Sequence, residues 1–112
     1  MKLKTKDVNN VTVIELKGNV MGGPDATALN DELHKLIETK KTKVVIDLHD
    51  VKFMNSSGLG MLIGSLTTIR NAGGDLKIAR ASDKIESLLI VTKLITVFDH
   101  HENVEKAVAA FK

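Results

Sequence analysis

The stretch from Val44 to Ala72 constrains the fold of this chain most, because it reads as a strand, a loop and a helix in succession. It begins with a compact apolar run, Val44 to Leu48, of the kind that forms a buried strand. A short polar and aromatic connection leads from there to the triplet Asn55 to Ser57. Asn and Ser side chains accept hydrogen bonds from the free N–H groups at a helix start. We therefore predict that a helix begins at this triplet, with its serine hydroxyls at the positive end.

The residues that follow have the periodicity of a helix with one apolar face. Leucine and isoleucine recur at steps of three and four residues, which places them together against a sheet: Leu59, Leu62, Ile63, Leu66 and Ile69. Gly60 and Gly64 lie in the same helix, where each glycine costs on the order of 1 kcal/mol relative to alanine. We therefore expect close packing of this helix against a strand or a partner's backbone. Ala72-Gly73-Gly74 is predicted to end it.

The segment before this unit predicts a hairpin and a helix. Residues 2–7 and 11–16 alternate or carry many β-branched side chains, and Asn9-Asn10 between them is a turn signal. Gly18 to Pro24 reads as a loop, and Pro24 suits the first turn of the amphipathic helix that follows. The first helix is predicted to bury Leu29 and Leu33.

The segment after the central unit adds shorter elements. Leu76 to Ala79 reads as a strand, Ser82 opens a helix, and a last short strand near Thr96 to Phe98 precedes a final helix that begins near Val104. Strands that alternate with helices after an initial hairpin predict an α/β fold. Its sheet should be mixed and largely parallel, covered by about four helices and beginning with a β-hairpin.

Length and apolar patterning bound the organisation. With 112 residues, of which 43% are hydrophobic, we expect a single domain spanning residues 1–112. The sequence has no apolar run near the length of a membrane span, no basic-then-apolar leader and no lipidation signal. We therefore expect no membrane association and a cytoplasmic location.

Charge and residue types exclude several classes of partner and chemistry. The net charge of +2 is near balance, and three phenylalanines are the only aromatic residues, so no nucleic-acid partner is expected. Cysteine is absent, which removes disulfides, thiolate chemistry and sulfur-based metal sites. His100-His101 offers imidazole beside carboxylates, but adjacent side chains usually diverge, so we expect a solvated turn and no metal.

Two segments together resemble a family signature. Val45-Ile46-Asp47-Leu48, followed by Asn55-Ser56-Ser57-Gly58-Leu59, resembles the motif of STAS domains, the family of bacterial anti-sigma-factor antagonists. That motif runs Val-Asp-Leu, then a few residues, then Asp-Ser-Ser-Gly-Leu, and the order of elements in this chain is similar throughout. Asn55 stands where an acidic residue is usual.

The resemblance implies a regulatory protein that is not an enzyme. Its unphosphorylated form would bind an anti-sigma factor that is also a serine kinase and so free a sigma factor, and a phosphatase would reverse the modification. Ser57 aligns with the phosphate-accepting position. The partner would supply ATP and magnesium, so the chain itself needs no cofactor. The implied partner-binding residues lie in the serine segment and in the first strand-to-helix loop: Gly22, Gly23, Asp25, Asn55, Ser56, Ser57, Gly58 and Leu59.

Alternatives remain beside this reading. Asn55 or Ser56 could serve only as a helix cap, and the chain could be a constitutive interaction module whose serine is never modified. A small-molecule-binding domain or a hydrolase is a third class, with His49 as the histidine nearest the serines in sequence, although we expect it in a polar loop. The Gly58, Gly60 and Gly64 spacing misses the dinucleotide-binding fingerprint by one residue.

Overall fold

The protein forms one five-stranded sheet in the computed structural model, which describes residues 1–111. The strands lie in the sheet in the same order as in the sequence. The first pair is antiparallel and the others are parallel, as predicted. Their bounds are β1 (Lys2–Val8), β2 (Val11–Val20), β3 (Lys43–Met54), β4 (Asp75–Ala79) and β5 (Asp99–His101).

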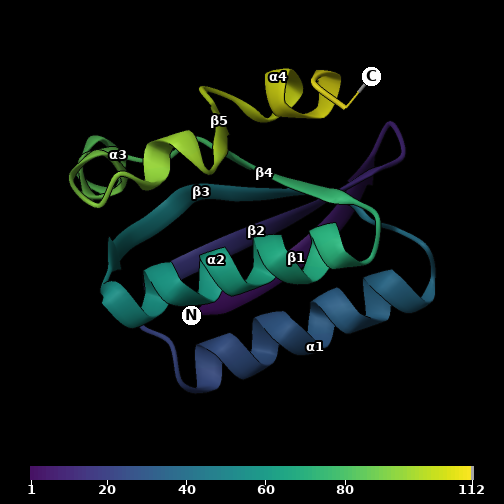
Figure 1. Cartoon of the computed structure of the whole chain (residues 1–112), viewed down its shortest axis with the longest axis horizontal. Helices are drawn as coiled ribbons and strands as arrows, with labels where there is room; N and C mark the ends of the chain where they lie inside the picture. Colours follow the sequence, from purple (N-terminus) through teal and green to yellow (C-terminus); the bar gives the residue numbers. More distant parts are fainter. Residues whose placement is uncertain (112) are drawn as a thin grey trace.

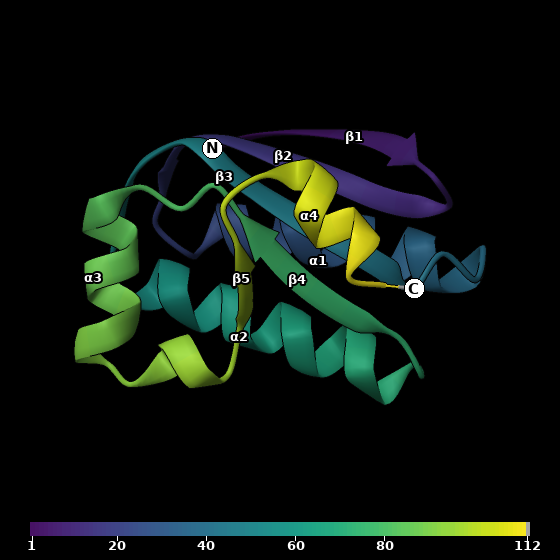
Figure 2. The same ribbon diagram turned by 90° about the horizontal axis from the view of Figure 1, so that it is seen from above.

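Helices cover both faces of the sheet (Figures 1 and 2). Two of them, α1 (Pro24–Glu38) and α2 (Ser56–Asn71), lie side by side beneath one face. The short α4 (Val104–Ala109) lies over the middle of the other face. Helix α3 (Asp83–Val91) lies beyond the end of β3, and its Ile85 and Leu89 join the core that α1 and α2 cover. A 3₁₀ turn, Leu94–Thr96, connects α3 to β5.

Strand alternation explains how the core divides into two parts. On β3, Val44, Ile46 and Leu48 face α1 and α2, where they join the larger cluster with Leu29, Leu33 and Leu62. Val45 points to the opposite face and packs in a smaller cluster beneath α4 with apolar residues from the hairpin and α4: Val11, Val13, Ala107 and Val108. A strand buried on both faces reads as a continuous apolar run, which is why residues 44–48 gave so clear a signal.

Three expectations about strand positions are wrong. Strand β2 continues to Val20, so Gly18 to Val20 pair with β3 and the loop before Pro24 has only residues 21–23. The last strand is Asp99–His101, and the segment near Thr96 to Phe98 belongs to the 3₁₀ turn and the residues after it. The connection after Leu48 is also not a loop, because β3 continues to Met54 and pairs there with the end of β2. His49 accordingly lies in a strand, where it is exposed and contacts Asp50 at 3.1 Å.

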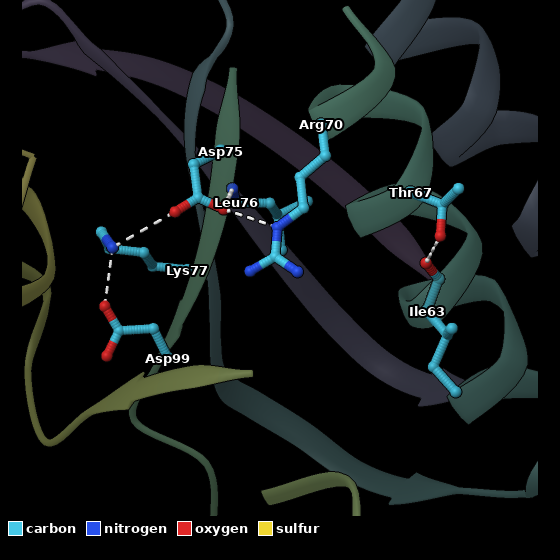
Figure 3. Close-up of polar contacts among 7 residues, drawn as sticks. All are labelled: Ile63, Thr67, Arg70, Asp75, Leu76, Lys77 and Asp99. Carbon is cyan, nitrogen blue, oxygen red and sulfur yellow. Dashed lines mark hydrogen bonds and ion pairs between the residues drawn. The ribbon is translucent and has the colours of Figure 1, made fainter. Parts of the chain in front are cut away.

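Ion pairs connect the last turn of α2 to β4 and β5 (Figure 3). Arg70 Nε lies 3.2 Å from Asp75 Oδ1, and Lys77 Nζ lies 3.5 Å from the other oxygen of that carboxylate. The same ammonium group contacts Asp99 Oδ2 at 2.6 Å. These four side chains come from α2, β4 and β5, so the ion pairs connect the short edge strand β5 to β4 and α2.

Candidate functional site

A side-chain cap fixes the start of α2. Asn55 has extended backbone angles, and its Oδ1 accepts a hydrogen bond from Gly58 N at 2.7 Å. The amides of Ser56 and Ser57 precede the first intrahelical bond, which runs from Leu59 N to Asn55 O. The helix therefore begins where the sequence predicted, with Asn55 as the cap.

Gly58 joins this helix start to the end of β2. It is buried, and a Cβ atom built on it would lie 2.0 Å from the carbonyl oxygen of Val20. The amide of Asn55 donates to that same oxygen at 3.4 Å. Only glycine allows so close an approach without a shift of backbone. The position of the serines thus depends on contact between β2 and the first turn of α2.

The β2–α1 loop, residues 21–23, lies against the serines. A Cβ atom on Gly22 would come within 2.7 Å of Ser57 Cβ, and both Gly22 and Gly23 have positive φ angles. Asp25, in the first turn of α1, closes this loop by accepting a hydrogen bond from Met21 N at 3.1 Å. Since β2 and β3 run parallel, their carboxyl ends bring the two loops together at one edge of the sheet.

The eight residues singled out by sequence divide by exposure. Ser56, Ser57 and Gly23 are exposed, while Asn55 and Asp25 are half-buried. The remaining three are buried beneath the surface of the two loops: Gly22, Gly58 and Leu59. Neither serine hydroxyl has a hydrogen-bond partner within residues 1–111. The surface made by the two loops therefore presents two free hydroxyl groups to solvent.

The electrostatics of this helix start favour an anion. The first turn of α2 contains no acidic residue, and its cap is a neutral amide. Free N–H groups and the positive end of the helix dipole point to the same place. The arrangement can hold a negative charge, but it offers no base aligned on either serine among the residues that the structure describes, since His49 contacts Asp50.

The histidine pair near the C-terminus is not a solvated turn. His100 and His101 lie in β5 and are half-buried. His100 Nε2 accepts a hydrogen bond from Ala81 N at 3.3 Å, and His101 Nε2 lies 3.1 Å from Asp99 Oδ2. Across residues 1–111, no group of three or more His, Asp or Glu side chains is arranged to hold a metal ion.

The glycines inside α2 do not pack against a strand, contrary to expectation. Gly60 and Gly64 are exposed, and a Cβ atom on either would meet nothing within 4 Å.

Residues 1–111 include no helix that is both long and apolar enough to span a bilayer.

Sequence reasoning missed an apolar groove that begins directly beside the serine segment. It has a volume of about 290 Å³ and is lined by Phe53 and Met54 of β3 together with Ile85, Leu88 and Val91 of α3. Phe53 and Val91 are 44% and 79% exposed. The sequence predicts a loop at Phe53 and Met54, where β3 continues, and it therefore gives no sign of the groove.

Comparison with known proteins finds a family model and relatives that match this chain. The family model of the STAS domain matches residues 2–107. The anti-sigma-B factor antagonist of Bacillus subtilis is 31% identical over 88 residues, which cover 76% of this chain and 80% of that protein.

Two solved structures share the fold. An anti-sigma factor antagonist from Mycobacterium paratuberculosis superposes with a TM-score of 0.82 at 21% identity, covering 97% of this chain and 92% of that one. The Bacillus cell fate determinant SpoIIAA in its phosphorylated form gives 0.74 at 17% identity, covering 99% and 100%. With a family match over nearly the whole chain and the motif at the start of α2, this protein belongs to the STAS domain family.

Proposed function

We propose that this protein is an anti-sigma factor antagonist that is switched by phosphorylation of Ser57. Unphosphorylated, it binds an anti-sigma factor that is also a serine kinase, and the sigma factor is released. The observation that carries the proposal is the exposed, unpartnered hydroxyl of Ser57 at the start of α2, beside the β2–α1 loop. The likeness to the Bacillus subtilis anti-sigma-B factor antagonist supports the choice of partner.

Ser57 is a better phosphoacceptor than Ser56 for a structural reason. Its Cβ lies against Gly22, so a phosphate on Ser57 stands at the junction of the two loops that form the proposed partner surface. Both serines are exposed, and exposure alone does not separate them. A group at the junction alters both halves of the surface at once.

Phosphorylation acts locally in this scheme. It adds about −1.5 to −2 charges at neutral pH, and the free amides of the first helical turn can hold them without refolding. The partner, docked on neutral hydroxyls, must then desolvate a dianion, which weakens association. Gly22, Gly58 and Leu59 contribute by fixing the loops, whereas Gly23, Asp25, Asn55, Ser56 and Ser57 lie at the surface.

The chain is the substrate of the modification in this proposal. Phosphoryl transfer depends on positioning and on charge neutralisation by metal ions and basic groups, and the kinase partner supplies these with ATP and magnesium. A phosphatase returns the protein to its binding form. We propose a cytoplasmic location, where both partners would meet it.

Site-localised mass spectrometry and calorimetry test the proposal together. The kinase partner should modify wild type and Ser56→Ala but not Ser57→Ala, and all three unmodified forms should bind the partner with similar affinity. The phosphorylated form should bind more weakly, and its amide NMR shifts should stay within the two loops. Phosphate on Ser56 alone, or equal affinities, would contradict it.

Asn55 favours one second candidate, a constitutive interaction module. The usual acidic residue is absent, and the amide of Asn55 caps the helix without it. In that case the partner binds the same surface, and Ser57 stays unmodified under every growth condition. Phosphoprotein analysis from the native cell distinguishes the two functions.

A further inference from the structure

A basic pocket lies at the end of β3 opposite the serines. It has a volume of about 370 Å³ and is formed by the β1–β2 turn and the α1–β3 connection, with these lining residues: Asp7, Asn10, Thr12, Lys40, Lys41, Thr42 and Lys43. Three lysines and one aspartate therefore border the pocket. The volume lies at the lower end of the range of small-molecule sites, which is about 300–1,000 Å³.

The single carboxylate in this pocket is already occupied. Asp7 Oδ2 lies 3.0 Å from Lys41 Nζ, and Asp7 Oδ1 accepts a hydrogen bond from the Thr12 hydroxyl at 3.3 Å. The hydrogen bond and charge of Lys41 lower the pKa of Asp7, so this carboxylate stays ionised at neutral pH. Lys40 and Lys43 have no ion-pair partner within residues 1–111 and are exposed. Their charges are free for a ligand.

The backbone at the end of α1 is arranged to bring these lysines together. Lys41 N donates to Leu36 O at 2.8 Å and Lys40 N donates to Ile37 O at 3.0 Å, the hydrogen bonds of a Schellman motif. The position with positive φ in that motif is usually glycine, but here it is Lys40, with φ of 61°. A side chain in this conformation is sterically unfavourable, so the usual preference for glycine at a helix end is broken at the border of the pocket.

We propose that this pocket binds a small phosphorylated molecule carrying two or more adjacent negative charges. Lys40 and Lys43 would neutralise the phosphate oxygens, and the side-chain amide of Asn10 and the hydroxyl of Thr42 add neutral donors on the two sides of the pocket. The site is separate from the serine segment, because β3 begins at Lys43 and the serines follow its other end.

Amide NMR titration of the whole chain with inorganic pyrophosphate, at ionic strength held constant with sodium chloride, tests the site. Saturable shifts are expected at Asn10 and residues 40–43. Lys40→Gln/Lys43→Gln should weaken binding by about tenfold or more, as expected when two charge-assisted contacts are lost. Asp7→Asn should strengthen it, because the change removes the only negative charge and frees Lys41.

Lys2→Gln/Lys4→Gln is the matched control, since it removes the same charge from the exposed strand β1. This variant should bind pyrophosphate as wild type does. Equal weakening in both double variants, or shifts that rise linearly without saturation, would show general charge attraction only and overturn the proposal. Unchanged binding in Lys40→Gln/Lys43→Gln would also overturn the proposal. It would show that these lysines only interact favourably with the negative C-terminal end of the α1 dipole.

Discussion

The two ends of α2 are built from different kinds of contact. At its N-terminal end, a neutral cap and close backbone packing hold the helix, through Asn55 and Gly58, and the first turn has no acidic side chain. At its C-terminal end, Arg70 begins a chain of ion pairs through Asp75 and Lys77 to β5 (Figure 3). The last turn of α2 thus carries a paired charge, whereas its first turn carries no charged side chain.

This difference shows how the same helix can be anchored and yet accept a new charge. The paired end gains little from any added ion, because its cations already have carboxylate partners. The neutral end keeps free N–H groups and hydroxyls exposed, so a phosphate there would be the dominant charge of its surroundings. Four substitutions, ordered by the size of the expected effect, test whether the ends are held as differently as the contacts indicate.

Leu62→Ala should have the largest effect, because Leu62 is fully buried between the two ends. Truncation of a buried leucine typically lowers the free energy of unfolding by about 2–5 kcal/mol. Chemical denaturation measures it, with Ser57→Ala, at an exposed position, as a near-neutral control. A neutral Leu62→Ala would mean that α2 does not depend on its core face.

Gly58→Ala should break the N-terminal end selectively. The new Cβ would lie 2.0 Å from Val20 O, and relief of such overpacking typically costs about 1–3 kcal/mol. The matched control is Gly60→Ala in the same helix, where a Cβ meets nothing within 4 Å. This control should raise stability by up to about 1 kcal/mol. If Gly58→Ala and Gly60→Ala changed the free energy of unfolding alike, the close contact between α2 and β2 would be contradicted.

Asn55→Ala should loosen the same end more mildly. It removes the acceptor of the Gly58 N–H hydrogen bond at 2.7 Å, and loss of a cap costs about 1 kcal/mol. Hydrogen exchange should quicken at the first turn of α2 and stay unchanged at Arg70. Ser56→Ala is the control, since its hydroxyl makes no hydrogen bond within residues 1–111, and it should leave both readings at wild-type values.

Asp99→Asn tests the charged end and should have the smallest effect, below about 1 kcal/mol, because the side chain is 47% exposed. The hydrogen bond from Lys77 lowers the pKa of Asp99 below its ordinary value of 3.8. Because its pKa is lowered in the folded protein, Asp99 stabilises the fold above pH 3.8. This contribution disappears as the pH falls through the lowered pKa.

The stability difference between wild type and Asp99→Asn should therefore be present at pH 7 and shrink in acid. Urea denaturation at pH 7, 5 and 3 measures it. Asp31→Asn removes an exposed charge that has no ion pair within residues 1–111, and it controls for net charge. A difference that grows in acid would mean that the Lys77–Asp99 pair does not stabilise the fold.

Most of the fold followed from local signals in the sequence. The apolar run at Val44 to Leu48, the hairpin turn at Asn9-Asn10 and the cap at Asn55 are each fixed by residues close together in the chain. Both turn residues have positive φ, 50° and 68°, which asparagine tolerates better than most residues. The mixed sheet and its order of elements were predicted correctly for this reason, whereas the single-domain organisation stays a prediction.

The features that sequence did not predict depend on distant partners. Strand β5 has only the residues Asp99–His101, and it exists because it pairs with β4 at Lys77 to Ala79. The second half of β3 pairs with β2 alone, since pairing with β4 ends at Asp47, so its polar side chains remain exposed and resemble a loop. At the site, contact of Gly22 with Ser57 follows from parallel pairing and leaves no local mark in the sequence.

The strand order of the sheet has a consequence for synthesis. Each strand pairs with the strand that precedes it in the chain, from β1 to β5. During translation, every new strand therefore meets an edge that has already been made, and no gap must stay open for a later segment. A nascent chain can therefore add strands to this sheet from the N-terminus to the C-terminus as the ribosome synthesises them. At each step the most recent strand exposes an unpaired edge, where aggregation can begin.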